Sequence, residues 1–149
     1  MKRIGKRVAG VLGALGMASM LVTGTAQADD GPVYFNAGGF HCAIFADGTV
    51  GCDTTSPTRL QYSFLPFLLT VNEMVIDQPW LPAHPTFDSG TRYTLPGGNP
   101  WINNVKTGDG AWGPYIEFAG ARCESGFHGS FGCKSKGRGW TAYSGTISA

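Results

Sequence analysis

The chain has 149 residues and a formal net charge of +1, and four of its eleven Lys and Arg residues lie within the first seven positions. Residues 29–149 therefore carry seven Lys and Arg against ten Asp and Glu, a mildly acidic balance that excludes general nucleic-acid binding. These 121 residues have the size of one small domain, in which disulfides contribute appreciably to stability. Gly and Pro account for 27 of them, which disfavours long helices.

Residues 1–28 are predicted to be a secretory signal peptide. Basic residues (Lys2, Arg3, Lys6 and Arg7) precede an apolar run from Val8 to Val22, which ends before the small-residue site Ala26-Gln27-Ala28. The run is short for a membrane span. We therefore expect cleavage after Ala28 and a mature domain, residues 29–149, that is soluble outside the cytoplasm and has no membrane span.

A cysteine loop of eleven residues occurs twice, as Cys42–Cys52 and Cys123–Cys133. Each copy predicts a β-hairpin, because Gly48 or Gly129 stands where a three-residue turn needs a left-handed residue. Counting outward from the turns places the two cysteines of each copy opposite each other, which predicts one cross-strand disulfide per hairpin. Pairing between the hairpins is the alternative connectivity. A zinc site is disfavoured because closely spaced Cys pairs are missing and an oxidising compartment is expected.

Aromatic and β-branched runs between Gly and Pro residues predict an all-β fold. The predicted strands are Val33–Phe35, Phe40–Phe45, Thr49–Asp53, Arg59–Phe64, Phe67–Ile76, Arg92–Leu95, Tyr115–Phe118, Arg122–Ser125, Ser130–Lys134 and Gly139–Tyr143. The apolar stretch Phe67–Ile76 fits a buried strand or a short helix, and we interpret it as the central core strand. The expected architecture is a small single-domain antiparallel sheet, sandwich or partial barrel.

Residues 78–114 are rich in Pro, Gly, Asn and Trp and are predicted to form a long ordered loop region. Trp80, Trp101 and Trp112 each lie in a turn-like context there. Exposed tryptophans in loops can stack on a sugar ring or anchor a protein partner, so these three are candidate ligand-binding residues. The interpretation that we favour is that the rings cover the core, as is common in small β domains.

A short basic segment precedes the last tryptophan. Lys134, Lys136 and Arg138 alternate with small residues, so on a strand they would share one face beside Trp140. This arrangement makes the four residues a second candidate ligand-binding surface. A solvated edge strand, in which lysines discourage aggregation, is the interpretation that we favour.

The sequence carries no recognisable catalytic signature, neither a nucleophile elbow nor a metal-binding helix motif nor a phosphate loop. The three histidines (His41, His84 and His128) are scattered and are interpreted as structural. The turn residues Asp47-Gly48 and Asp109-Gly110 lack the ligand spacing of an EF-hand. We therefore expect no catalytic residue, no cofactor and no metal ion. A hydrolase with dispersed carboxylates is the alternative, drawing on Glu73, Asp77, Glu117 and Glu124.

Two sequence segments, GGFHCAIFADGTVGCD and GARCESGFHGSFGCKSKGRGW, resemble small exported actinobacterial proteins of unknown function. The residues that carry the resemblance are Gly39, Cys42, Cys52, Asp53, Cys123, Gly129, Phe131, Cys133, Gly137, Gly139 and Trp140. The likeness covers the two ends of the mature chain well and its middle loosely. It implies export and two disulfides, and it implies no activity.

The function expected from the sequence is that of a secreted, non-catalytic module that binds cell-envelope polysaccharide or an extracellular protein. A secreted inhibitor or effector is the second hypothesis, in which the rigid hairpin tip Gly126–Gly129 inserts into the cleft of a partner. The dispersed-carboxylate hydrolase is the third.

Overall fold

Four pairs of consecutive strands are joined by two-residue turns in which the second residue is glycine. Both residues of each turn have positive φ, as in the type I′ turns that match the right-handed twist of paired strands. The four turns are Gly38-Gly39, Ala119-Gly120, Lys136-Gly137 and Ser144-Gly145. Because such turns connect antiparallel neighbours, they order much of the sheet along the chain.

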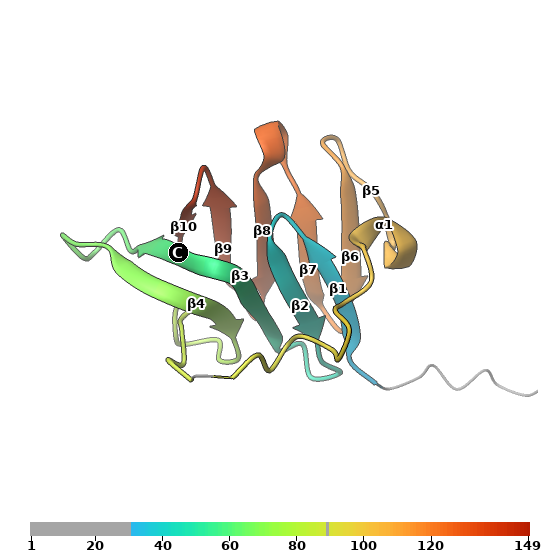
Figure 1. The fold of residues 1–149 in the computed structure, drawn as a ribbon, viewed down its shortest axis with the longest axis horizontal. Coiled ribbons are helices and arrows are strands. Elements are labelled where there is room, and N and C mark those ends of the chain that lie inside the picture. The colour runs from blue at the N-terminus through green and yellow to red at the C-terminus, as the bar shows by residue number, and fades with distance from the viewer. Residues whose placement is uncertain (1–30, 89) are drawn as a thin grey trace, which may run out of the picture.

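The computed structural model describes residues 31–88 and 90–149, which form the curled sheet shown in Figure 1. The strands are β1 (Val33–Ala37), β2 (Phe40–Ile44), β3 (Val50–Gln61), β4 (Leu69–Ile76), β5 (Gly108–Asp109), β6 (Pro114–Phe118), β7 (Ala121–Ser125), β8 (Phe131–Ser135), β9 (Arg138–Tyr143) and β10 (Thr146–Ser148). One short helix, α1 (Ile102–Val105), and one 3₁₀ turn (Phe127–Gly129) complete the described elements. The predicted signal peptide lies outside the described residues.

The strands follow the order β1-β2-β3-β10-β9-β8-β7-β6-β5, and β4 pairs with β3 beside this path. Neighbouring strands are antiparallel, except that β10 runs parallel to β3. The all-β prediction is therefore confirmed. Of the predicted architectures, the structure has the partial barrel, because one continuous sheet curls round on itself (Figure 1).

The repeat seen in the cysteine loops extends over three strands of each half of the sheet. Strands β6, β7 and β8 begin at 114, 121 and 131, each 81 residues after β1, β2 and β3, which begin at 33, 40 and 50. Cys123 and Cys133 are displaced from Cys42 and Cys52 by the same interval. Each half of the sheet therefore contains one three-stranded unit, β1–β3 or β6–β8, with the same spacing of strands.

Both predicted disulfides are present in the core between these two units. Cys42 lies directly opposite Cys52, and Cys123 opposite Cys133, as the hairpin count requires. Each bond joins Cα atoms 4.0 Å apart, and both bonds are buried. Since all four cysteines are oxidised, neither the alternative pairing nor the zinc site occurs.

Aromatic rings fill the space beside the two disulfides. Phe40 lies 5.0 Å from Trp140 and 5.6 Å from Phe131, measured between ring centroids. Phe35 meets Phe131 edge to face at 6.3 Å. These rings belong to strands of both units, so the hydrophobic effect holds the curl of the sheet closed.

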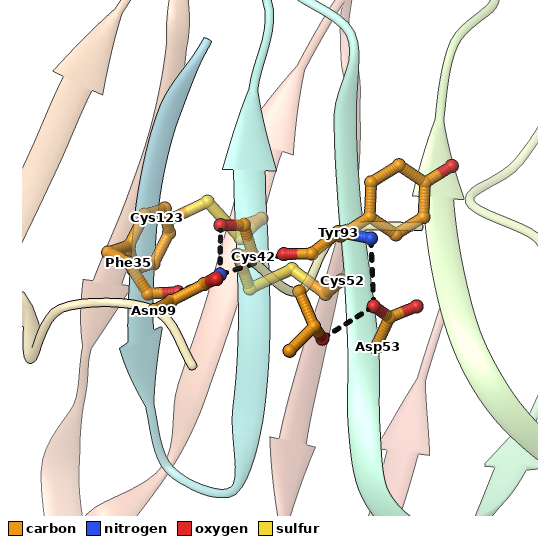
Figure 2. Close-up of a disulfide and its surroundings, with 9 residues drawn as sticks. Phe35, Cys42, Cys52, Asp53, Tyr93, Asn99 and Cys123 are labelled. Carbon is orange, nitrogen blue, oxygen red and sulfur yellow. Dashed lines mark hydrogen bonds between the residues drawn. A yellow bond between two sulfur atoms is a disulfide. The ribbon is translucent and has the colours of Figure 1, made fainter. Parts of the chain in front are cut away.

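The loop after Tyr93 closes the opening between β1 and β6. Asn36 of β1 donates its backbone N–H to the carbonyl of Pro100 at 2.7 Å, and Ile102 of α1 is buried in the core. The buried side chain of Asn99 donates to the carbonyls of Phe35 and Cys42 at 3.1 and 3.0 Å (Figure 2). The predicted long loop is thus ordered by the hydrogen bonds that Asn99 and Pro100 make with β1 and β2.

Four predicted strands differ from the structure. The predicted strand 92–95 does not form, and its residues lie in the loop between β4 and α1. The apolar stretch at 67–76 is not a central strand: β4 pairs with β3 alone, and Phe67 and Leu68 lie exposed in the preceding loop. Val71 of β4 is buried in the core, while Val75 packs in a second cluster with Tyr93, which explains the apolar density. The predicted strands 49–53 and 59–64 merge into β3, whose pairing shifts between 53 and 58, around Pro57.

The two cysteine hairpins differ at their tips. Gly48 has φ +80° and donates its N–H to the carbonyl of Phe45 at 2.9 Å, as the predicted three-residue turn requires. In the second hairpin both His128 and Gly129 have positive φ, and Ser130 donates to the carbonyl of Phe127 at 3.1 Å. The second tip is therefore a type I′ turn, which is tighter than predicted.

Candidate functional site

The predicted tryptophans are dispersed over the molecule. Trp80, Trp101 and Trp112 are 70%, 49% and 64% exposed, respectively, so their rings do not cover the core. Trp140 is buried among the core phenylalanines, which removes its ring from the surface proposed from the sequence. Of these tryptophans, Trp112 alone has an exposed aromatic neighbour close by among the described residues.

That neighbour is Phe127, at the tip of the second cysteine hairpin. The rings of Trp112 and Phe127 meet edge to face with centroids 4.6 Å apart, and the ring of His128 stacks on Phe127 at 3.8 Å. Phe127 is 53% exposed. We call these three residues the aromatic tip. The β5–β6 and β7–β8 connections that carry them stand side by side in Figure 1.

Below the aromatic tip, the outer face of β7, β8 and β9 is hollowed. A cavity of about 200 Å³, which we call the polar hollow, is lined by Arg122, Glu124, Ser130, Gly132, Lys134 and Thr141, among others. A Cβ atom on Gly132 would lie 2.6 Å from the carbonyl oxygen of Trp140, so the close approach of the strands admits only glycine there. Gly126 and Ser130 flank Phe127–Gly129 and also line the hollow, which makes it continuous with the tip.

Arg122 is held at the centre of this face. Its guanidinium carbon lies 3.6 Å from the centre of the Tyr115 ring, and its Nε donates to Glu124 at 3.0 Å. A second nitrogen lies 3.3 Å from Glu117. The hydrogen bond to Glu124 raises the pKa of Arg122 above its ordinary value. Arg122 therefore presents a fixed, permanently charged donor on this face.

The predicted basic stripe is split by a turn. Lys136 occupies the first position of the β8–β9 turn, so the three cations do not alternate along one strand. Lys134 is exposed on the outer face, whereas Arg138 pairs with buried Ser135 and donates to the carbonyl of Pro79 at 2.7 Å. They still approach one another: together with Arg122 they line a neighbouring cavity of about 530 Å³, the basic hollow.

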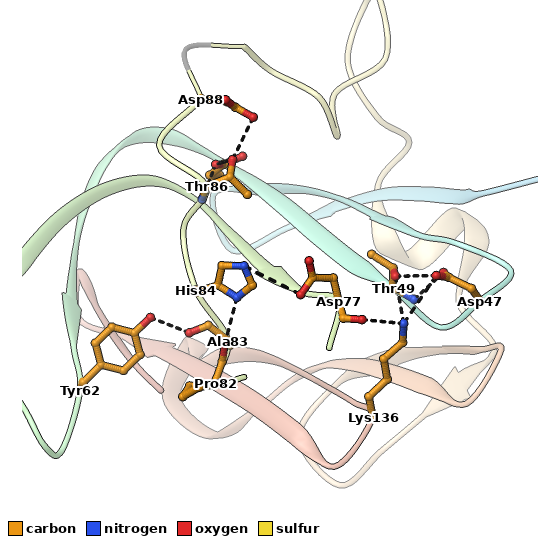
Figure 3. A network of polar contacts seen from close by, with 11 residues as sticks. Asp47, Thr49, Tyr62, Asp77, Pro82, Ala83, His84, Thr86, Asp88 and Lys136 are labelled. Atoms are coloured by element: carbon orange, nitrogen blue, oxygen red, sulfur yellow. Dashed lines mark hydrogen bonds and ion pairs between the residues drawn. The ribbon is translucent and has the colours of Figure 1, made fainter. Parts of the chain in front are cut away.

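Lys136 has a structural role, which Figure 3 shows. Its Nζ donates to the carbonyl of Asp77 at 2.9 Å and to the hydroxyl of Thr49 at 3.1 Å, and lies 3.5 Å from Asp47. Hydrogen bonds from Thr49, with a smaller contribution from the charge of Lys136, lower the pKa of Asp47 below its ordinary value. Lys136 thus ties the second unit to the tip of the first cysteine hairpin.

The four carboxylates proposed for hydrolysis fall into two separate places. Glu73 is buried on β4, and Asp77, just beyond β4, lies 3.8 Å from His84. Glu117 and Glu124 are on the outer face, where both pair with Arg122. The structure therefore places no more than two of the four at one site.

Sequence reasoning did not assign Tyr115, Arg122, Glu124, Ser130 and Thr141 to a binding surface. The signal was present as the alternation of strands β6 to β9, in which every second residue is polar, small or aromatic and faces outward. Recognising it requires the register of three consecutive hairpins, which the two-residue turns supply.

Comparisons with models of known protein families, with curated proteins and with solved structures found no match for this chain. Within residues 31–88 and 90–149, no helix has the length and apolar character needed to cross a bilayer.

Proposed function

We propose that this chain is exported and that its mature domain is a non-catalytic module that binds an anionic polysaccharide of the cell envelope. The binding surface is the outer face of β6 to β9, from the aromatic tip through the polar hollow to the basic hollow. The observation that carries the proposal is the exposed Trp112–Phe127 pair beside a hollow lined by charged and hydroxyl side chains.

The aromatic tip suits the apolar faces of sugar rings. Exposed rings have a large apolar surface and lose little side-chain entropy on binding, which makes them effective anchors. Trp112 and Phe127 support each other edge to face, so a ligand meets an ordered platform. The Cys123–Cys133 disulfide spans the base of the hairpin that carries Phe127 and restrains it further.

The two hollows suit the polar and anionic groups of the same polymer. Ser130 and Thr141 offer hydroxyls and Glu124 offers an acceptor in the polar hollow. Arg122 and Lys134 line both hollows, so positive charge extends along the surface toward Lys136 and Arg138. Charges in this arrangement favour an anionic chain over a neutral one and accelerate its encounter with the protein.

Two features support export. Both disulfides fit an oxidising compartment, where such bonds persist. The expected signal peptide at residues 1–28 has the basic, apolar and small-residue regions that direct secretion.

The test is co-sedimentation of the purified, oxidised protein with isolated envelope polysaccharide. Trp112→Ala and Phe127→Ala should each weaken binding by roughly tenfold, equivalent to about 1.4 kcal/mol. Trp80→Ala is the matched control, because this ring is similarly exposed and lines neither hollow. The proposal fails if Trp80→Ala weakens binding as much as Trp112→Ala does, or if the wild-type protein does not sediment with any envelope polysaccharide.

The aromatic tip also favours a second candidate function, a secreted inhibitor or effector that inserts the tip into a partner's cleft. Phe127 is half exposed on a tight, disulfide-restrained turn, as such insertion requires. This function predicts saturable binding to an extracellular protein that Phe127→Ala abolishes and that Lys134→Ser leaves unchanged. Polysaccharide binding predicts that both substitutions weaken the interaction.

A further inference from the structure

Two carboxylates are buried side by side on the half of the sheet that the proposed function does not use. Asp53 of β3 lies directly opposite Glu73 of β4, and residues so paired project from the same face of a sheet. Their side chains are 3% and 2% exposed. Burying an ionised carboxylate is costly unless its charge is balanced and its oxygens are hydrogen-bonded.

Each carboxylate has one oxygen that is satisfied by the loop covering it. We call residues 86–88 and 90–94 of this loop the strap. Oδ2 of Asp53 accepts hydrogen bonds from the backbone N–H of Tyr93 at 2.8 Å and from the hydroxyl of Thr94 at 2.7 Å (Figure 2). Oε1 of Glu73 accepts from the backbone N–H of Thr86 at 2.7 Å and from the Thr86 hydroxyl.

The second oxygen of each carboxylate is buried without a partner. Oδ1 of Asp53 and Oε2 of Glu73 have no hydrogen-bond donor among the described residues. In Figure 2 the second oxygen of Asp53 points away from the Tyr93 N–H. Such orphaned, fully buried acceptors are rare and need an explanation, such as a bound water molecule or ion.

A third carboxylate, that of Asp88, approaches Glu73 through the hydroxyl of Thr86. The hydroxyl of Thr86 is 3.1 Å from Oδ2 of Asp88 while it also contacts Glu73, and its single proton can serve only one of them (Figure 3). The charged group that faces Asp88 is Arg92, at 2.5 Å. His41 lies opposite Asp53 on β2, where its Nδ1 is 3.4 Å from the N–H of Asn99. The charged groups in this region are therefore three carboxylates and one guanidinium, so negative charge is in excess.

A hollow of about 220 Å³ leads to Asp53 from the surface. Its lining includes Asp53, Thr55, Ser56, Asn72, Asp88 and Thr91, all of which carry side-chain oxygens. Among the described residues, no Lys, Arg or His lines it. Carboxylate, amide and hydroxyl oxygens without nitrogen or sulfur donors are the ligand set of hard divalent cations.

We propose that this hollow is a calcium site. Oδ1 of Asp53 is the buried ligand, Asp88 and Asn72 supply further oxygens from the hollow, and the double positive charge of the ion balances Asp53 and Glu73. The irregular lining suits calcium, which accepts variable coordination, better than magnesium, which demands a near-ideal octahedron. Calcium binding then holds the strap against β3 and β4, because the strap supplies both a ligand and the donors to the two carboxylates.

The experiment uses the purified, oxidised protein after treatment with EDTA. Terbium, which replaces calcium in oxygen sites, should luminesce on excitation of the tyrosines, and calcium should displace it. Tyr93→Phe should reduce this luminescence several-fold while leaving calcium binding intact. At saturating calcium the melting temperature should rise by about 5–10 °C.

Asp53→Asn changes a ligand of the ion, and Glu73→Gln changes the neighbouring buried charge that the ion balances. Each keeps the shape of the side chain and removes one buried charge. We expect both variants to melt no lower than the wild type in EDTA, and to lose the calcium-induced rise. Asp109→Asn is the control, since Asp109 is exposed and paired with Lys106; it should keep the full rise.

Three results overturn the proposal. The first is an absence of terbium luminescence and of any melting shift in the wild type at millimolar calcium. The second is a calcium response retained in Asp53→Asn or Glu73→Gln. The third is a shift produced equally by magnesium. If Asp53→Asn does not fold, the terbium–calcium competition in the wild type and the response of Glu73→Gln decide the matter.

Discussion

Ser135 of the second unit donates a 2.6 Å hydrogen bond from its buried hydroxyl to the carbonyl oxygen of Gly48, at the tip of the first cysteine hairpin. The tip of the first cysteine hairpin therefore contacts the end of β8. Lys136, in the following β8–β9 turn, contacts the same tip through a hydrogen bond to Thr49. The two repeated units are thus joined by specific polar contacts as well as by the shared core.

This contact predicts that Gly48 tolerates no side chain. Gly48 has φ +80°, and a Cβ there would lie 2.8 Å from the carbonyl oxygen of Ala119. Gly120 has nearly the same φ, +78°, but a Cβ there meets nothing within 4 Å. Gly120→Ala should lower the free energy of unfolding by about 1 kcal/mol, and Gly48→Ala by at least about 2 kcal/mol more, as urea denaturation will measure. Equal losses would show that the tip does not press against Ala119.

The two disulfides are predicted to stabilise the fold as a coupled pair. The Sγ atoms of Cys42, Cys52 and Cys133 lie within 4.8 Å of one another. Replacing either pair of cysteines by alanine should lower the free energy of unfolding by about 3 kcal/mol, because each ring closes eleven residues. Replacing both pairs should depart from the sum of the two losses, since the bonds pack together. Strict additivity in denaturant unfolding would mean that they act independently.

Stability should fall at alkaline pH because two tyrosines are buried. Burial raises the pKa of Tyr62 and of Tyr93 above the ordinary value of 10.0. A raised pKa in the folded state means that the stabilisation is complete below the unfolded value and is lost as pH rises above it. Denaturant midpoints around pH 8 and pH 11 should therefore differ, and the difference should shrink in Tyr62→Phe and in Tyr93→Phe. An undiminished fall in both variants would assign the alkaline sensitivity to other groups.

Substitution of Lys134 should affect ligand binding alone, whereas substitution of Lys136 should affect the stability of the fold. Lys134→Ser should weaken polysaccharide binding several-fold at low salt, with a loss that fades as ionic strength rises, and should leave the melting temperature unchanged. Lys136→Met should lower the free energy of unfolding by about 1 kcal/mol, because it removes the hydrogen bonds to Asp77 and Thr49. The assignment is wrong if Lys134→Ser destabilises the fold or if Lys136→Met leaves it unchanged.

Several features of the candidate sites were beyond prediction from the sequence. Trp112 and Phe127 are separated by a complete hairpin, and they meet only because the β5–β6 and β7–β8 connections reach the same end of the sheet. Asp53 and Glu73 become neighbours through the pairing of β3 with β4, whose register shifts across an irregularity at 53–58. Neither the Trp112–Phe127 contact nor the Asp53–Glu73 pairing can be inferred from the spacing of these residues in the sequence.

The sequence by itself determined the all-β class and the two local disulfides. These depend on short-range physics: glycine supplies positive φ, and counting outward from a turn decides which cysteines face each other. The tertiary structure alone decided that both disulfides share one core, that Trp140 lies inside, and that a turn splits Lys134 from Arg138. Those outcomes depend on the curl of the sheet and on which face each strand turns inward, and both are settled by burial across the whole domain.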